Sequence, residues 1–107
     1  MNYEIYIVSD AEEDIFGIYH YVSINDSEDR AKYLLNKIET TCFSLKEHPE
    51  RDHVPPELER IGVYHYREIH FKPYRVIYEI SESKVFIHCV LDGRRSLPEL
   101  LERRLLR

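Results

Sequence analysis

The sequence has 107 residues, of which 43% are hydrophobic and 33% charged, and its net charge is −5. This length is about one domain, so we expect residues 1–107 to form a single domain and exclude separate cofactor and substrate modules. No apolar run approaches the roughly 20 residues of a spanning helix, and no signal-like segment begins the chain, which predicts a cytoplasmic protein without membrane insertion. We interpret the two cysteines, Cys42 and Cys89, as free thiols.

The charge is distributed unevenly along the chain. Residues 1–59 contain 5 Lys/Arg and 14 Asp/Glu, whereas residues 60–107 contain 10 Lys/Arg and 6 Asp/Glu. The net charge therefore combines an acidic first half at −9 with a basic second half at +4. This asymmetry indicates a basic functional surface, and the alternative is that acidic helices lie in the first half by chance.

The first half predicts one strand and a helical hairpin. The expected elements are a strand at 3–8, a helix at about 10–22, and a second helix from the polar break at 25–27 to about residue 47. Ser9 precedes Glu12 by three residues, the spacing of a capping box, and Ser27 offers the cap of the second helix. His48 precedes a proline, which ends the second helix there. The outer face of this hairpin holds most of the acidic charge.

The second half predicts three strands and a last helix. The expected elements are strands at 64–71, 74–80 and 84–91 and a helix from about residue 97 to the end, capped by Ser96 and Glu99. Short connections at 72–73 and 81–83 favour an antiparallel meander. The order β-α-α-β-β-β-α predicts an α+β fold with the helical hairpin packed on a small, antiparallel-rich twisted sheet. The other sheet face keeps enough apolar groups to need a cover or a partner.

Familiar catalytic motifs are absent from the sequence. The chain has only 3 glycines and no Gly-rich phosphate loop, and its six histidines show no metal-ligand spacing. His65 and His70 are expected on opposite faces of one strand, and His88 and Cys89 on opposite faces of another. We therefore expect no metal site and no cofactor.

A set of arginines remains as the candidate functional site: Arg67, Arg75, Arg94 and Arg95. Arg67 and Arg75 flank a tight turn and are expected to converge on one side of adjacent strands, where they would bind an anion. Nearby tyrosines could stack on bases or fill a protein interface: Tyr66, Tyr74 and Tyr78. The alternative is structural, with Arg67 and Arg75 paired internally to Glu68, Glu79 or Asp92.

Two segments carry a resemblance to a known family. The string YHYREIHFKPYRVIYEI, followed by VFIHCVLDGRRSLPELLERRL, resembles the RelE/ParE superfamily of bacterial toxins of type II toxin–antitoxin modules, many of which are called plasmid stabilisation proteins. The resemblance covers nearly the whole chain, in the order and spacing of its motifs. It implies the same α+β fold and a growth-arresting toxin.

The resemblance implies one of two targets. One branch of the superfamily cleaves mRNA on the ribosome, and its arginine positions match Arg67, Arg75 and either Arg94 or Arg95, with His88 as a possible base. Three features count against this branch. The strand that carries Arg67 has Glu68 and Ile69 where a lysine is expected, no Tyr or His follows His88, and the net charge is −5. The V-L-D-G-R-R turn is more similar to the branch that inhibits DNA gyrase without being a nuclease. We favour the gyrase branch, with the ribosome-dependent mRNA endonuclease as the alternative and an inactive protein-binding module as a third.

The resemblance also implies a protein partner. A cognate antitoxin with an acidic C-terminal segment is expected to form a hetero-oligomer with the chain. The residues expected to bind the antitoxin or the target are Arg67, Tyr74, Arg75, Tyr78, Arg94, Arg95, Arg103 and Arg104.

Overall fold

The computed structural model describes residues 2–95 and 97–106 and has the predicted α+β architecture. Its main elements are β1 (Glu4–Ile7), α1 (Ser9–Asn25), α2 (Glu28–Phe43), β2 (Tyr66–Phe71), β3 (Tyr74–Ser81), β4 (Lys84–Asp92) and α4 (Pro98–Leu105). The region predicted as a loop also contains two short 3-10 turns, at Ser44–Lys46 and Pro49–Arg51, and a one-turn helix, α3 (Pro56–Glu59). The predicted element order is therefore confirmed, with α3 added.

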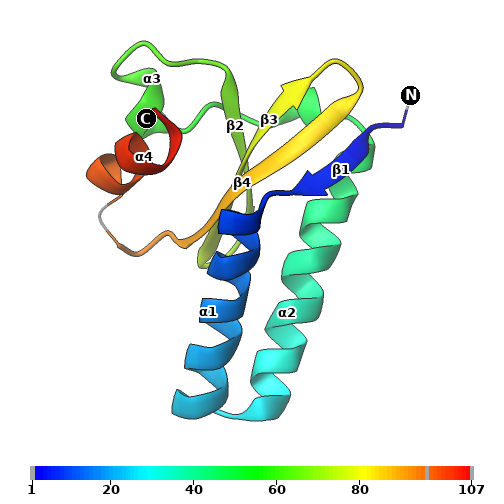
Figure 1. Ribbon diagram of the computed structural model, residues 1–107, viewed down its shortest axis with the longest axis vertical. Coiled ribbons are helices and arrows are strands. Elements are labelled where there is room, and N and C mark those ends of the chain that lie inside the picture. Colours follow the sequence, from blue (N-terminus) through cyan, green and yellow to red (C-terminus); the bar gives the residue numbers. More distant parts are fainter. Residues whose placement is uncertain (1, 96, 107) are drawn as a thin grey trace.

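The four strands form one mixed sheet in the order β1-β4-β3-β2. β1 runs parallel to β4, whereas the β2–β3 and β3–β4 pairs are antiparallel. The parallel pairing follows from the hairpin, because α1 and α2 carry the chain away from the sheet and back before the meander begins. The α1–α2 hairpin extends from one side of the sheet, and α3 and α4 lie together near the opposite side (Figure 1).

The hairpin confirms one predicted cap and corrects the other. The Ser27 hydroxyl accepts a hydrogen bond from the backbone N–H of Arg30 at 3.0 Å, as expected of an N-cap. The predicted capping box at Ser9 is wrong, because α1 already begins at Ser9 and Val8 occupies the cap position. The Val8 N–H donates to the Ile87 carbonyl at 3.1 Å, so the helix starts directly after the sheet pairing ends. Ser96, predicted to cap α4, lies outside the described residues.

Each face of the sheet packs against helices, which explains why both faces of the strands are apolar. Val76 and Tyr78 of β3 are fully buried against the hairpin, and Ile77 between them is fully buried on the side of α3 and α4. The second core consists of Leu58, Tyr66, Ile77, Cys89, Leu91, Leu97 and Leu101. The cover expected for this face is therefore supplied by the chain itself.

The two cysteines are free and buried on opposite faces of the sheet, as the interpretation of unpaired thiols requires. Burial raises the pKa of Cys42 and of Cys89 to about 12. Among the described residues, no helix is both long and apolar enough to cross a membrane.

Candidate functional site

The strand register separates Arg67 from Arg75. Arg67 is paired with Tyr78, and Arg75 is paired with His70 three residues further along β2. Because side chains alternate along a strand, Arg67 lies on the hairpin face with Tyr78 and Arg75 lies on the α3–α4 face. The predicted convergence of these two arginines is therefore wrong.

Arg67 and Tyr78 hold the loop that follows α2. The Arg67 Nη1 donates to the Asp52 carbonyl at 2.5 Å. The Tyr78 hydroxyl donates to the Pro49 carbonyl at 2.5 Å and lies 2.9 Å from the Asp52 carboxylate. Burial, followed by the contact with Asp52, raises the pKa of Tyr78 above its ordinary value. Tyr78 is 0% exposed, so it is a core residue and has no surface for stacking on a base.

Arg75 bridges two carboxylates on the opposite face. Its Nη1 and Nη2 donate to Glu57 at 2.6 and 2.7 Å, and its Nε and Nη2 donate to Glu68 at 2.6 and 3.1 Å. The hydrogen bonds from Arg75 lower the pKa of Glu57. Burial alone would raise the pKa of Glu68, but the hydrogen bonds from Arg75 and His70 outweigh it and hold that pKa below its ordinary value. The structural alternative proposed for Arg75 is confirmed for Glu68, and Glu57 is a partner that sequence reasoning did not find.

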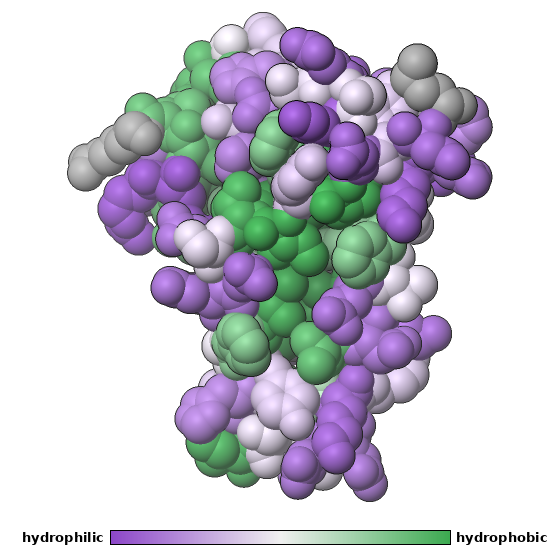
Figure 2. Space-filling model, turned by 45° about the vertical axis from the view of Figure 1, so that its right-hand side comes forward, coloured by the Kyte–Doolittle hydropathy of each residue, from purple (hydrophilic) through white to green (hydrophobic). Residues whose placement is uncertain are grey.

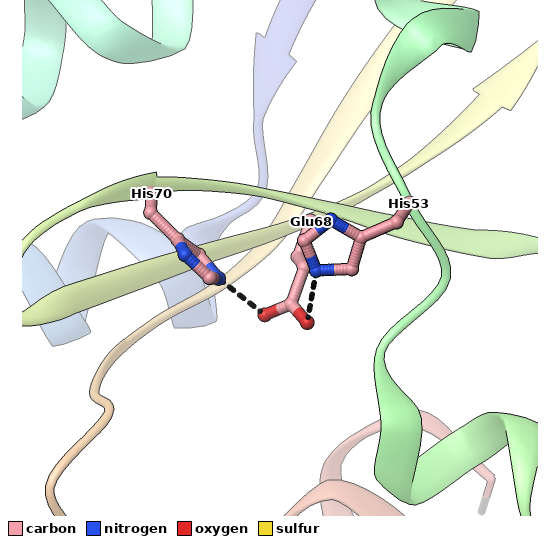
Figure 3. Close-up of side chains that lie close together, drawn as sticks. All are labelled: His53, Glu68 and His70. Atoms are coloured by element: carbon pink, nitrogen blue, oxygen red, sulfur yellow. Dashed lines mark hydrogen bonds and ion pairs between the residues drawn. The ribbon is translucent and has the colours of Figure 1, made fainter.

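Two histidines complete this network around Glu68. His53 Nε2 lies 3.0 Å from one carboxylate oxygen and His70 Nε2 lies 3.0 Å from the other. Figure 3 shows the two imidazole rings directed toward the carboxylate from separate segments of the chain. The backbone reinforces this arrangement, because the Glu68 N–H donates to the His53 carbonyl at 2.9 Å in an isolated β-bridge. The sequence shows no metal-ligand spacing among the histidines, and the i, i+2 spacing of Glu68 and His70 is the one signal it gives for this group.

A β-bulge places His88 differently from the prediction. Ile77 is paired with Cys89 and Tyr78 with Ile87, so His88 has no partner on β3. His88 contacts Tyr66 edge-on at 5.6 Å between ring centroids, and Cys89 packs in the same core as Tyr66. The prediction that His88 and Cys89 point to opposite faces is wrong, because a bulge turns two successive side chains toward one side. His88 Nε2 lies 3.1 Å from Glu79.

The turn after β4 presents the most accessible arginines of the candidate set. Arg94 is 73% exposed and Arg95 is also exposed. The Arg94 guanidinium donates to Asp92 at 2.7 and 3.0 Å. The turn requires Gly93, because a Cβ atom there would lie 2.9 Å from the Pro73 carbonyl oxygen.

A groove connects this turn with α1. It has a volume of about 510 Å³ and is lined by Glu13, Asp14, Gly17, Ile18, Tyr21, Tyr74, Val90, Leu91, Asp92, Arg94 and Arg95. Three members of the predicted binding set, Tyr74, Arg94 and Arg95, therefore share one surface. Arg104 lies beside it and donates to Asp14 at 2.9 and 3.0 Å, which ties α4 to α1. Arg103 is exposed on α4 and does not line the groove.

Exposed apolar side chains lie along the hairpin, and one of them, Tyr21, also lines the groove. Those exposed by more than 40% are Phe16, Tyr21, Ile24, Tyr33 and Phe43. Figure 2 shows an apolar area bordered by polar side chains where the hairpin meets the sheet. Contiguous apolar surface of this kind is typical of a protein-binding face.

Comparison with known proteins identifies the family. Residues 5–97 match the family model described as ParE toxin of type II toxin-antitoxin system, parDE. The chain belongs to this toxin family. It is therefore a type II toxin of the RelE/ParE superfamily, as the resemblance implied. The comparison with curated proteins found no significant match.

Solved structures show the same fold. A chain of the chromosomal ParDE toxin–antitoxin system from P. aeruginosa has a TM-score of 0.70 at 13% identity, with 82% of this chain and 92% of that chain covered. A chain of the RelBE2 toxin–antitoxin complex from Mycobacterium tuberculosis has a TM-score of 0.63 at 18% identity, with 86% and 92% covered. At these identities the similarity concerns the fold, which both branches of the superfamily share.

Proposed function

We propose that this toxin arrests growth by binding DNA gyrase and has no nuclease activity of its own. The observation that carries the proposal is that the candidate catalytic residues do not share one site. Arg67 faces the hairpin and holds a loop carbonyl, whereas Arg75 faces α3 and binds two carboxylates. Arg94 is paired with Asp92. Each of these guanidinium groups already has an acceptor within the chain.

RNA cleavage by this kind of protein requires groups that act together on one phosphate. A base must take the proton of the 2′-hydroxyl, an acid must protonate the leaving oxygen, and a cation must stabilise the charge that develops between them. His88 is paired with Glu79, and its ring lies against Tyr66. The net charge of −5 also opposes binding to a particle rich in phosphate. These features support a binding protein over an enzyme.

A supercoiling assay tests the proposal. Purified toxin is added to DNA gyrase and a relaxed plasmid, and ATP-dependent supercoiling is followed with increasing toxin. We expect supercoiling to fall as toxin increases and to recover when the cognate antitoxin is added. Full supercoiling at a large excess of folded toxin would contradict the proposal.

The ribosome-dependent endonuclease is the second candidate, and one observation favours it. The imidazoles of His53 and His70 lie beside the Arg75 guanidinium, which is the type of pairing that acid–base cleavage uses. A translating extract tests it: toxin-dependent cuts in mRNA that disappear in His70→Ala and in His88→Ala would favour the nuclease. Intact mRNA would exclude it. A toxin inactive in both assays that still binds an antitoxin would fit the third possibility, a protein-binding module.

We propose that the groove between α1 and the β4 turn receives a segment of the cognate antitoxin. The half-buried Ile18 and the exposed Tyr21 supply apolar surface, and Arg94 and Arg95 supply exposed positive charge. An amphipathic segment with acidic residues fits both features. An adjacent reading frame encoding a short protein with an acidic C-terminal segment, copurifying with the toxin, is the expected result. No complex between the two purified proteins would contradict it.

A further inference from the structure

The side chains around Glu68 have the composition of a metal centre. One ring nitrogen each of His53 and His70 and a carboxylate oxygen of Glu68 all lie within 4.8 Å of one another. We propose that these three residues form a binding site for a late first-row divalent cation, Zn²⁺ in the first instance. Two imidazoles and one carboxylate are a ligand set that holds zinc with a further position open to water.

The distances are close to those that a bound ion requires. Zinc binds imidazole nitrogen and carboxylate oxygen at roughly 2.0–2.2 Å, so two ligand atoms on a tetrahedral ion lie about 3.3 Å apart. Each histidine Nε2 already lies 3.0 Å from an oxygen of Glu68. Small rotations of the two exposed rings, which are 60% and 41% accessible, would bring the nitrogens around one ion.

The Glu68 carboxylate can bind the ion and keep its two hydrogen bonds from Arg75. Oε1 accepts one hydrogen bond from Arg75 and one from His70, and Oε2 accepts one from Arg75 and one from His53. When the histidines carry their proton on Nδ1, each Nε2 has a free lone pair and Glu68 keeps its two bonds to Arg75. Arg75 then orients the carboxylate from behind the ion, as partners of metal ligands do in other sites.

The local charge favours a cation despite Arg75. Glu57 and Glu68 each carry one negative charge, and Arg75 carries one positive charge between them. With both imidazoles neutral the group therefore has a net charge of −1. Glu57 offsets the charge of the guanidinium that would otherwise repel the ion. Glu57 does not contact the metal and acts only by holding Arg75 in place.

The backbone holds the three ligands in place before any ion binds. Glu68 and His70 are two apart on β2 and so share one face. His53 comes from the loop before α3, and the isolated bridge to Glu68 fixes its position. A site built on a strand and a bridged loop loses little conformational entropy when it binds. This inference does not depend on whether gyrase is the target.

Zinc titration of the intact protein tests the site. Calorimetry with a competing chelator at pH 7.5 is expected to show one Zn²⁺ per chain, with affinity lower by at least about tenfold in His53→Ala and in His70→Ala. His20→Ala, which removes an exposed histidine on α1, is the matched control and is expected to bind as the unchanged protein does. Circular dichroism confirms that each variant is folded.

Cobalt provides a readout that does not rely on the variants. Co²⁺ bound by two imidazoles and a carboxylate at low coordination number is expected to show visible absorption bands that Zn²⁺ displaces. The proposal is overturned if no such bands develop, or if the double variant H53A/H70A binds Zn²⁺ within about twofold of the unchanged protein. Either result would mean that binding, where present, is adventitious association with other surface histidines.

Discussion

Arg75 on β3 donates two hydrogen bonds to the carboxylate of Glu68 on β2, from Nε to Oε1 at 2.6 Å and from Nη2 to Oε2 at 3.1 Å. Glu68 is 1% exposed and is the one charged side chain in the buried set of the described residues. A carboxylate so deeply buried is stable in its charged form only when its acceptors are satisfied. The Arg75–Glu68 pair is therefore a structural requirement of the α3–α4 face.

We expect Arg75→Ala to destabilise the protein by about 3–5 kcal/mol, because it leaves Glu68 buried and without its cation. Urea unfolding followed by circular dichroism measures the change in the free energy of unfolding. Arg95→Ala is the control: its side chain is exposed on the turn, and we expect a change within about 0.5 kcal/mol. Equal stability of the two variants would contradict the structural role of Arg75. Loss of toxicity in Arg75→Ala indicates a lost functional contact only where circular dichroism shows that the variant is folded.

The same network predicts a dependence of stability on pH. The pKa of Glu57 is below its ordinary value of 4.5, chiefly because Arg75 donates to it. A carboxyl group whose pKa is lower in the folded than in the unfolded protein adds to the free energy of unfolding. This contribution is complete at a pH above the unfolded pKa and is lost as the pH falls through the folded pKa. We expect the free energy of unfolding to fall between pH 6 and pH 3, less steeply in Glu57→Gln than in the unchanged protein. Glu99→Gln, exposed on α4, is expected to keep the steeper slope.

The sequence predicts the positions of the strands, but the structure places Arg67 and Arg75 on opposite faces of the sheet and not on one. The three meander strands lie within two residues of their predicted ends, because short aromatic and β-branched runs are separated by clear turn residues. Phe71 and Tyr74 pair across the two-residue connection, so Arg67 pairs with Tyr78. Counting outward from that turn would have placed Arg67 and Arg75 on opposite faces.

Other features left no signal in the chain. The bulge at His88 shifts the alternation of β4 by one residue, and nothing in the composition of that strand marks where the shift occurs. His53 meets Glu68 across 15 residues of loop and short helix, and such a contact depends on the path of that loop. Sequence reasoning therefore found the elements and the family and missed the His53–Glu68–His70 group.

Two glycines allow a direct test of the packing at the β4 turn. A Cβ atom at Gly93 would lie 2.9 Å from the Pro73 carbonyl oxygen and 3.0 Å from Arg75 Cδ. We expect Gly93→Ala to destabilise the protein by about 1–3 kcal/mol because backbone must move to make room. Gly17 lies inside α1 with nothing within 4 Å of its Cβ position, so Gly17→Ala is expected to stabilise by about 0.5–1 kcal/mol. Thermal unfolding of both variants checks the pair, and destabilisation by Gly17→Ala would contradict the open environment described for that helix.

The groove proposal makes a charge-specific prediction about antitoxin binding. Arg94 and Arg95 line the groove and are exposed, so reversing both charges in R94E/R95E places negative charge where an acidic segment would bind. We expect the affinity for the antitoxin to fall by about 10–100-fold, and the loss to shrink in high salt because exposed charges are screened. Binding kinetics on immobilised antitoxin measure both effects.

Arg103→Glu is the matched control for that prediction. Arg103 is exposed on α4 but lines a different surface, with Glu99, Glu102 and Leu106. A single reversal there changes the net charge without touching the groove, so we expect the affinity to change by less than about threefold, through long-range charge alone. If Arg103→Glu weakens antitoxin binding as strongly as R94E/R95E does, the antitoxin binds on α4 or responds only to net charge, and the groove is not its site.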